Sequence, residues 1–179
     1  MCIRDRPDLD ALAAELGSDV TFLLHGGTAV GTGRGEVLSP VLTRAEFHWV
    51  IALADGGLST AAVYGEYDRM RPDAPEPRLS DELMQALRAG DTAALGAALH
   101  NDLQAPALAL RPGLRRTLDA GMEEGALGAL VSGSGPTCAF LARDADYALD
   151  LAVALSASGT CRSVRRATGP VAGATVVTT

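Results

Sequence analysis

Apolar residues near the start of the chain recur at the spacing of a helix. After Asp8 the apolar positions fall three or four residues apart or side by side: Leu9, Leu12, Ala13 and Leu16. This period predicts a helix with one apolar face, and Gly17 is a typical residue at which such a helix ends. Asp19 is then expected just past the helix end, and residues 20–24, which are mostly apolar, are expected to be buried.

A glycine-rich stretch follows and predicts a hairpin. Residues 28–30 and 37–38 have strand-like composition on either side of it. The turn between them would be supplied by three glycines: Gly31, Gly33 and Gly35.

A buried strand, a helix and a linker are predicted next. The apolar run at residues 48–54 is typical of a buried strand. Ser59 or Thr60 can cap a helix that continues to about Met70. Residues 71–79 then hold three prolines, which neither a helix interior nor a central strand tolerates, so a linker is expected there.

The remaining pattern predicts a mixed α+β domain. Helices are expected at 80–89, 91–104, 111–123 and 144–156, and strands at 127–131, 137–142, 161–167 and 174–177. Helices and strands alternate without the regular rhythm of a doubly wound sheet, which favours α+β. We therefore expect a non-native leader at 1–7, a first unit at 8–70, the linker at 71–79 and a second domain at 80–179.

Composition narrows the class of partner to small molecules. The 179 residues are 47% hydrophobic, enough for a core, and the formal net charge of −7 argues against nucleic acid or an acidic membrane as partner. The three cysteines and three histidines show no disulfide or metal-ligand spacing, so no metal site is predicted. No apolar run approaches the ~20 residues of a membrane-spanning helix. These features favour a cytoplasmic protein.

Asp19 is the first candidate for chemistry. A carboxylate beside an apolar segment can accept the proton of an attacking hydroxyl, as in phosphoryl transfer. The alternative is that Asp19 only hydrogen-bonds the backbone of its own Gly-Ser-Asp turn. The pattern by itself favours that structural role.

Two further candidates carry hydroxyl groups. Ser132, Gly133, Ser134 and Gly135 lie between two predicted strands, where successive N–H groups can point at an anion. The alternative role, a turn that uses Gly and Ser only for its geometry, has equal weight. Thr60 could bond a substrate, although a capping role explains it fully.

The chain resembles the GHMP kinase superfamily, and within it the kinases that act on 4-diphosphocytidyl-2-C-methyl-D-erythritol. The resemblance runs from about Asp8 to the C-terminus and is carried by residues 16–20, 26–29, 33–36, 58–61 with Tyr64, and 131–137. The resemblance implies the GHMP kinase fold, with the end of an N-terminal domain at 8–70 and a complete ferredoxin-like C-terminal domain at 80–179. It also implies an ATP- and Mg²⁺-dependent phosphorylation of the substrate's 2-hydroxyl, in the methylerythritol phosphate route to isoprenoids.

The resemblance assigns roles to the candidates. Asp19 matches the catalytic aspartate, residues 132–137 match a glycine-rich motif of the phosphate and substrate region, and Thr60 matches a threonine near the substrate pocket. Thr21 stands where the family usually has proline.

Other family features are missing from the sequence. The family's catalytic lysine and its glycine-rich ATP loop have no counterpart, and the chain contains no lysine. We therefore expect an N-terminally truncated fragment that is inactive alone. A non-catalytic binding or interaction module, and another small-molecule kinase of the superfamily, remain as alternatives.

Overall fold

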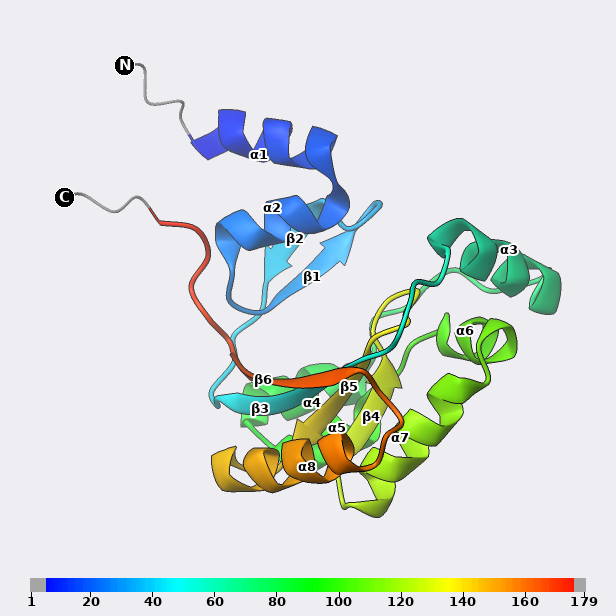
Figure 1. The fold of residues 1–179 in the computed structure, drawn as a ribbon. Helices are drawn as coiled ribbons and strands as arrows, with labels where there is room; N and C mark the ends of the chain where they lie inside the picture. Colours follow the sequence, from blue (N-terminus) through cyan, green and yellow to red (C-terminus); the bar gives the residue numbers. More distant parts are fainter. Residues whose placement is uncertain (1–5, 176–179) are drawn as a thin grey trace.

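The structure, a computed structural model, describes residues 6–175 and contains two groups of elements (Figure 1). The first group comprises α1 (Arg6–Leu16), α2 (Ser18–His25), β1 (Ala29–Thr32) and β2 (Val37–Pro40). The second comprises β3 (Phe47–Leu53), α3 (Thr60–Met70), α4 (Asp81–Ala89), α5 (Thr92–Ala98), α6 (Gln104–Leu110), α7 (Gly113–Glu123), β4 (Gly128–Val131), β5 (Cys138–Ala142), α8 (Ala145–Ala157) and β6 (Ser163–Gly169). The mixture of helices and antiparallel strands confirms the α+β prediction.

The first group confirms the predicted helix and hairpin and corrects the segment between them. Strands β1 and β2 pair antiparallel, and Gly33 and Gly35 turn the chain with φ values of 70° and 108°. Residues 20–24 belong to helix α2, and their expected burial is largely wrong. Phe22 is 37% and Leu23 65% exposed, because a helix presents consecutive side chains to different sides.

The end of helix α2 is tied to a segment far along the chain. The backbone N–H of Ala174 donates to the Leu23 carbonyl at 2.9 Å, and that of Gly27 donates to the Val171 carbonyl at 2.7 Å. Gly26 (φ 65°) packs directly on the backbone of Gly173, so a Cβ at Gly26 would collide with it. Residues 171–174 therefore fix the position of α2.

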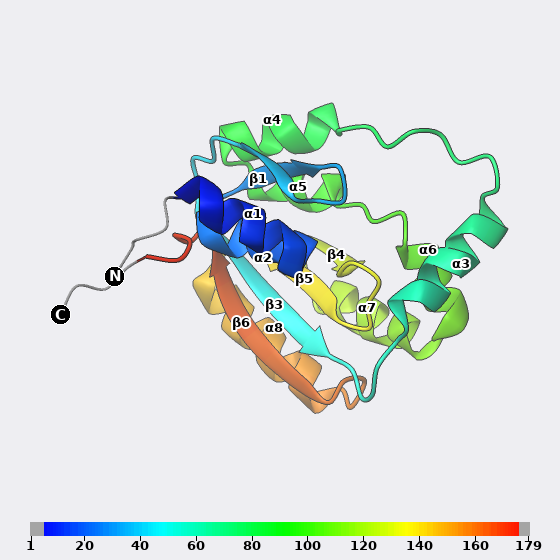
Figure 2. The same ribbon diagram turned by 90° about the horizontal axis from the view of Figure 1, so that it is seen from above.

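The second group contains a four-stranded antiparallel sheet with the strand order β4-β5-β3-β6. Together with the helices that connect the strands, this order is the ferredoxin-like arrangement that the resemblance implies. Strand β3 lies inside the sheet, between β5 and β6 (Figure 2). The boundary expected at 71–79 would separate β3 from both of its partners. Instead, one sheet contains strands from both sides of residues 71–79. The proline-rich segment joins two helices of the same group, α3 and α4.

Neighbouring residues of the central strands enter two different apolar clusters. Val50 and Phe140 are fully buried in a cluster with helices α7 and α8. Trp49 and Leu141 belong instead to a cluster with helices α4 and α5. Adjacent side chains of a strand point to opposite faces, so the sheet has a core on each side.

Two predicted elements differ from the structure. The helix expected at 91–104 is interrupted: α5 ends at Ala98, Leu99 is extended (φ −63°, ψ 127°), and α6 begins only at Gln104. Residues 174 and 175 form no strand, and the rest of the strand expected at 174–177 lies outside the described residues. The leader expected at 1–7 also lies mostly outside them.

A glycine contact between α5 and β4 should be sensitive to substitution. A Cβ at Gly96 would collide with the carbonyl oxygen of Leu127. Gly96→Ala should therefore lower the free energy of unfolding by about 1–3 kcal/mol, measured as a lower urea midpoint by circular dichroism.

Gly65→Ala is the matched control, because Gly65 lies in helix α3 and nothing approaches its Cβ position within 4 Å. Alanine there should raise the free energy of unfolding by about 0.5–1 kcal/mol. Equal midpoints for the two variants would contradict the close packing of α5 on β4.

Candidate functional site

Asp19 lies in the first turn of helix α2 and is exposed. Gly17 is the N-cap and offers no side-chain cap, although its carbonyl accepts the Val20 N–H at 3.1 Å, and the first turn carries the acidic residue Asp19. A carboxylate is favoured at that end by the helix dipole. The first turn of α2 points toward the end of the sheet where the β4–β5 turn and the start of α3 lie (Figures 1 and 2).

The predicted loop at 132–137 is the turn between strands β4 and β5. The Ser132 N–H donates to the Thr137 carbonyl at 2.8 Å, and the Gly135 N–H donates to the Ser132 carbonyl at 2.9 Å. Gly133 and Gly135 have φ values of 54° and 79°, which disfavour any other residue. Within residues 6–175, the N–H groups of Gly133 and Ser134 have no acceptor. Two successive donors are thus available to an anion.

The structure brings two of the three candidates together. The hydroxyl oxygens of Thr60 and Ser134 lie 2.9 Å apart and share a hydrogen bond, although 74 residues separate them. Ser59 is the N-cap of α3 and accepts the Ala62 N–H, which leaves the Thr60 hydroxyl available for this contact. Among the described residues, no hydrogen bond joins Asp19 to either of them.

The side chains of Asn101 and Gln104 hydrogen-bond to backbone groups at the β4–β5 turn, and neither residue was predicted from the sequence. Asn101 Nδ2 donates to the carbonyls of Val131 and Gly133 at 2.6 and 2.8 Å. Gln104 Oε1 accepts the Val131 N–H at 2.8 Å. The available signal was the polar triplet at 100–102, which interrupts two apolar helical stretches.

An arginine fixes the segment that leads into α3. The Arg111 guanidinium donates to the carbonyls of Asp55 and Gly57, the latter at 3.3 Å. These bonds hold the 55–57 turn and hence the start of α3, where Thr60 lies. The site therefore depends on contacts from α6, the residue after it and the 99–103 segment.

The described residues narrow the possible chemistry. No group of three His, Cys, Asp or Glu residues within 6–175 could hold a metal ion. Burial raises the pKa of the Cys138 thiol to about 12, so this cysteine stays protonated and is a poor nucleophile. None of the helices described is both long and apolar enough to cross a membrane.

Comparison with known sequences finds a family model and relatives that this chain resembles. Residues 83–161 match the family model "GHMP kinases C terminal". A Thermobifida fusca protein named 4-diphosphocytidyl-2-C-methyl-D-erythritol kinase is 67% identical over 172 residues, 96% of this chain and 56% of the relative. Residues 83–161 therefore form a GHMP kinase C-terminal domain. A Nocardia farcinica protein of the same name is 62% identical over 96% of this chain and 57% of the relative. The chain thus spans about half the length of these curated relatives.

Solved structures agree with this assignment. A crystal structure of 4-(cytidine 5'-diphospho)-2C-methyl-D-erythritol kinase matches with a TM-score of 0.75 and 33% identity, over 90% of this chain and 56% of that one. Mevalonate kinase of L. major matches with a TM-score of 0.61 and 22% identity, over 82% of this chain and 49% of that one, and so shares the fold alone. The GHMP kinase fold expected from the sequence is confirmed.

Asn101 should be important for the stability of the β4–β5 turn. Asn101→Ala leaves the carbonyls of Val131 and Gly133 without their donor, so the free energy of unfolding should fall by about 1–3 kcal/mol. Urea unfolding measures the loss, and amide hydrogen exchange at residues 132–137 should become faster. The control Asp102→Asn changes an exposed carboxylate bonded to His100 and should stay within about 0.5 kcal/mol. An unchanged turn in Asn101→Ala would contradict its role.

Thr21 carries a hydroxyl that the fold does not satisfy. The residue is 4% exposed and its Oγ1 has no hydrogen-bond partner in the described chain. Thr21→Val keeps the shape and removes the unpaired hydroxyl, so the free energy of unfolding should rise by about 1 kcal/mol. Thr168→Val, at an exposed position of β6, is the control and should change stability by less than about 0.5 kcal/mol. A loss of stability in Thr21→Val would mean that the hydroxyl has a partner.

Proposed function

We propose that this chain forms part of an ATP-dependent kinase that phosphorylates the 2-hydroxyl of 4-diphosphocytidyl-2-C-methyl-D-erythritol. The observation that carries the proposal is the 67% identity to the Thermobifida fusca kinase over 96% of the chain. A match of that extent leaves out only about 7 of the 179 residues, so it includes both the Asp19 region and the turn at 132–137. The reaction belongs to isoprenoid biosynthesis and would take place in the cytoplasm, where ATP is available.

Asp19 is assigned the role of general base. Its carboxylate is exposed at the start of α2, where a substrate hydroxyl can reach it. A carboxylate can accept the proton that the hydroxyl loses as its oxygen attacks the γ-phosphorus of ATP. The bond from the γ-phosphorus to the bridging oxygen breaks as the new P–O bond forms, and ADP leaves.

The β4–β5 turn is assigned to the phosphate and substrate region. The free N–H groups of Gly133 and Ser134 and the paired hydroxyls of Ser134 and Thr60 form a set of donors that fits an anionic phosphoryl group. Fixed donors of this kind stabilise the charge that develops during transfer. Mg²⁺, when bound, would neutralise the charge of the nucleotide phosphates. Because Mg²⁺ usually has few protein ligands, this role is compatible with the absence, within residues 6–175, of a group of three His, Cys, Asp or Glu side chains that could hold a metal ion.

This chain should not catalyse the reaction without the rest of the enzyme. It spans 56% of the length of the Thermobifida fusca relative, and it contains no lysine to supply the family's catalytic cation. The purified 179-residue chain should release no ADP from ATP and the cytidylyl substrate in a coupled assay. A chimera that joins the remaining residues of that relative to this chain should be active. It should prefer the cytidylyl substrate over mevalonate and homoserine.

In the chimera, Asp19→Asn should lower kcat by about 10²–10⁴. Glu15→Gln is the matched control, since Glu15 is an exposed carboxylate on α1 outside the proposed site, and it should leave kcat unchanged. Full activity in the Asp19→Asn chimera would overturn the role of general base. Turnover by the 179-residue chain alone would overturn the need for the remaining residues.

A further inference from the structure

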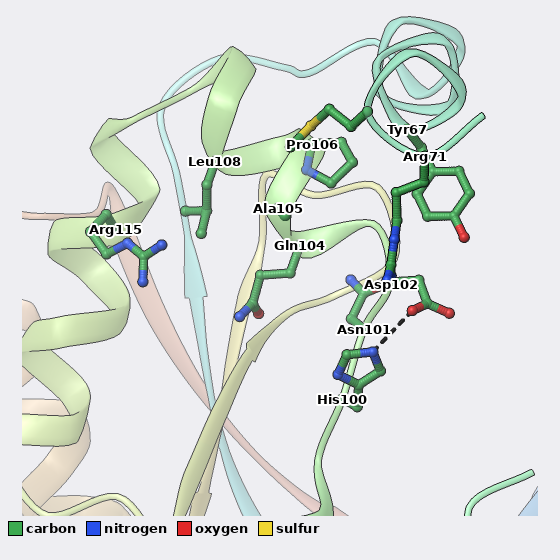
Figure 3. A pocket seen from close by; sticks show the side chains of 11 residues that line it. Tyr67, Arg71, His100, Asn101, Asp102, Gln104, Ala105, Pro106, Leu108 and Arg115 are labelled. Carbon is green, nitrogen blue, oxygen red and sulfur yellow. Dashed lines mark hydrogen bonds and ion pairs between the residues drawn. The ribbon is translucent and has the colours of Figure 1, made fainter. Parts of the chain in front are cut away.

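A cavity of about 450 Å³ lies on the side of α6 that faces α3 and α7 (Figure 3). This volume is in the range of pockets that bind small molecules. The cavity contains neither Asp19 nor any residue of the 132–137 turn, so it is separate from the proposed phosphate region. The lining residues with the most bearing on ligand binding are Tyr67, Met70, Arg71, Gln104, Pro106 and Arg115.

Two arginines enter the cavity without a carboxylate partner. Arg115 reaches in from α7 on one side, Arg71 lies at the end of α3 on the other, and Gln104 lies between them (Figure 3). Within residues 6–175, neither guanidinium is paired with an acidic side chain. The carboxylate that lines the cavity, Asp102, is bonded to His100 at 3.0 Å. The net charge of the lining therefore favours an anionic group.

Gln104 adds a neutral donor to the same space. Its Oε1 accepts the Val131 N–H at 2.8 Å, which fixes the orientation of the amide. The Nε2 group is thereby turned toward the side of Arg115 (Figure 3). An amide N–H and a guanidinium directed at one point can hold a phosphate or carboxylate by charge-assisted hydrogen bonds.

Part of the lining is apolar. Met70, Pro106 and Leu108 line the cavity, and the last two are buried in the fold, so this surface is already in place. Tyr67 lies at the far end beside Arg71. The lining therefore suits a molecule with an apolar body and one anionic end.

We propose that this cavity binds a small organic phosphate or carboxylate, with the anion on Arg115 and Gln104 and the apolar body against Met70, Pro106 and Leu108. The proposal does not depend on the kinase activity. Because Gln104 also holds the Val131 N–H, the ligand touches a residue that supports the β4–β5 turn.

Calorimetric titration of the purified chain with phenyl phosphate tests the proposal. We expect saturable binding to one site. Arg115→Gln should raise the Kd at least about fivefold by removing a charged donor, while Arg116→Gln should stay within about twofold. Arg116 is the matched control because it is the next residue of α7, is exposed and does not line the cavity. Inorganic phosphate, which lacks the apolar body, should bind at least about tenfold more weakly than phenyl phosphate.

Two more variants separate the cavity from the phosphate region. Ala105→Trp, at an exposed position on the cavity wall, should block binding of phenyl phosphate without changing the core. Ser134→Ala should leave the Kd unchanged. The proposal is overturned if no saturable binding occurs, if Arg115→Gln and Arg116→Gln have equal effects, or if inorganic phosphate binds as tightly. Weaker binding in Ser134→Ala alone would place the ligand on the β4–β5 turn and would also overturn it.

Discussion

The pairing of strand β3 on both of its edges is the constraint on which the rest of the structure depends. Its backbone bonds to β5 on one side and to β6 on the other, so it joins segments that lie about 90 and about 115 residues later in the sequence. The strand also contributes to both apolar clusters, through Val50 on one face and Trp49 on the other. The position of α3 follows from this placement, because the chain leaves β3 through the short turn at 55–57.

The two candidate hydroxyls meet for the same reason. Thr60 follows β3, and Ser134 lies in the turn that leads into β5, the neighbour of β3. Antiparallel neighbours bring the end of one strand beside the start of the next, so the contact at 2.9 Å is a consequence of sheet register. Neither residue needs an unusual local conformation to reach the other.

Local sequence signals predicted much of the fold. The helix ending at Gly17, the glycine hairpin and the strand that became β3 all depend on spacing within one element, and the structure confirms them. The signals that failed depend on distant contacts. The 91–104 helix is interrupted because the 99–103 segment carries Asn101, whose side chain supports a turn some 30 residues later. Helix propensity is a property of each residue alone, so it does not reflect a hydrogen-bond partner in a distant segment.

The residues of the candidate site show the same difference between local signals, which could be predicted, and long-range contacts, which could not. Ser134 and Thr60 could be found from a turn motif and a capping motif, and their contact only from the structure. Asn101, Gln104 and Arg111 were missed because each acts on a backbone group of another segment. A side chain that hydrogen-bonds to the backbone of a distant turn produces no recognisable spacing pattern in a single sequence. The role proposed for Asp19 comes from the resemblance, since its place at a helix start would suit any acidic residue.

The ties between α2 and residues 171–174 have a consequence for biosynthesis. Leu23 and Ala174 are bonded to each other across about 150 residues of chain. A ribosome adds residues in order, so helix α2 emerges long before the segment that secures it. The helix that carries Asp19 must therefore remain without this anchor through most of translation. Its anchored position becomes available only after residues 171–174, which follow strand β6, have been added.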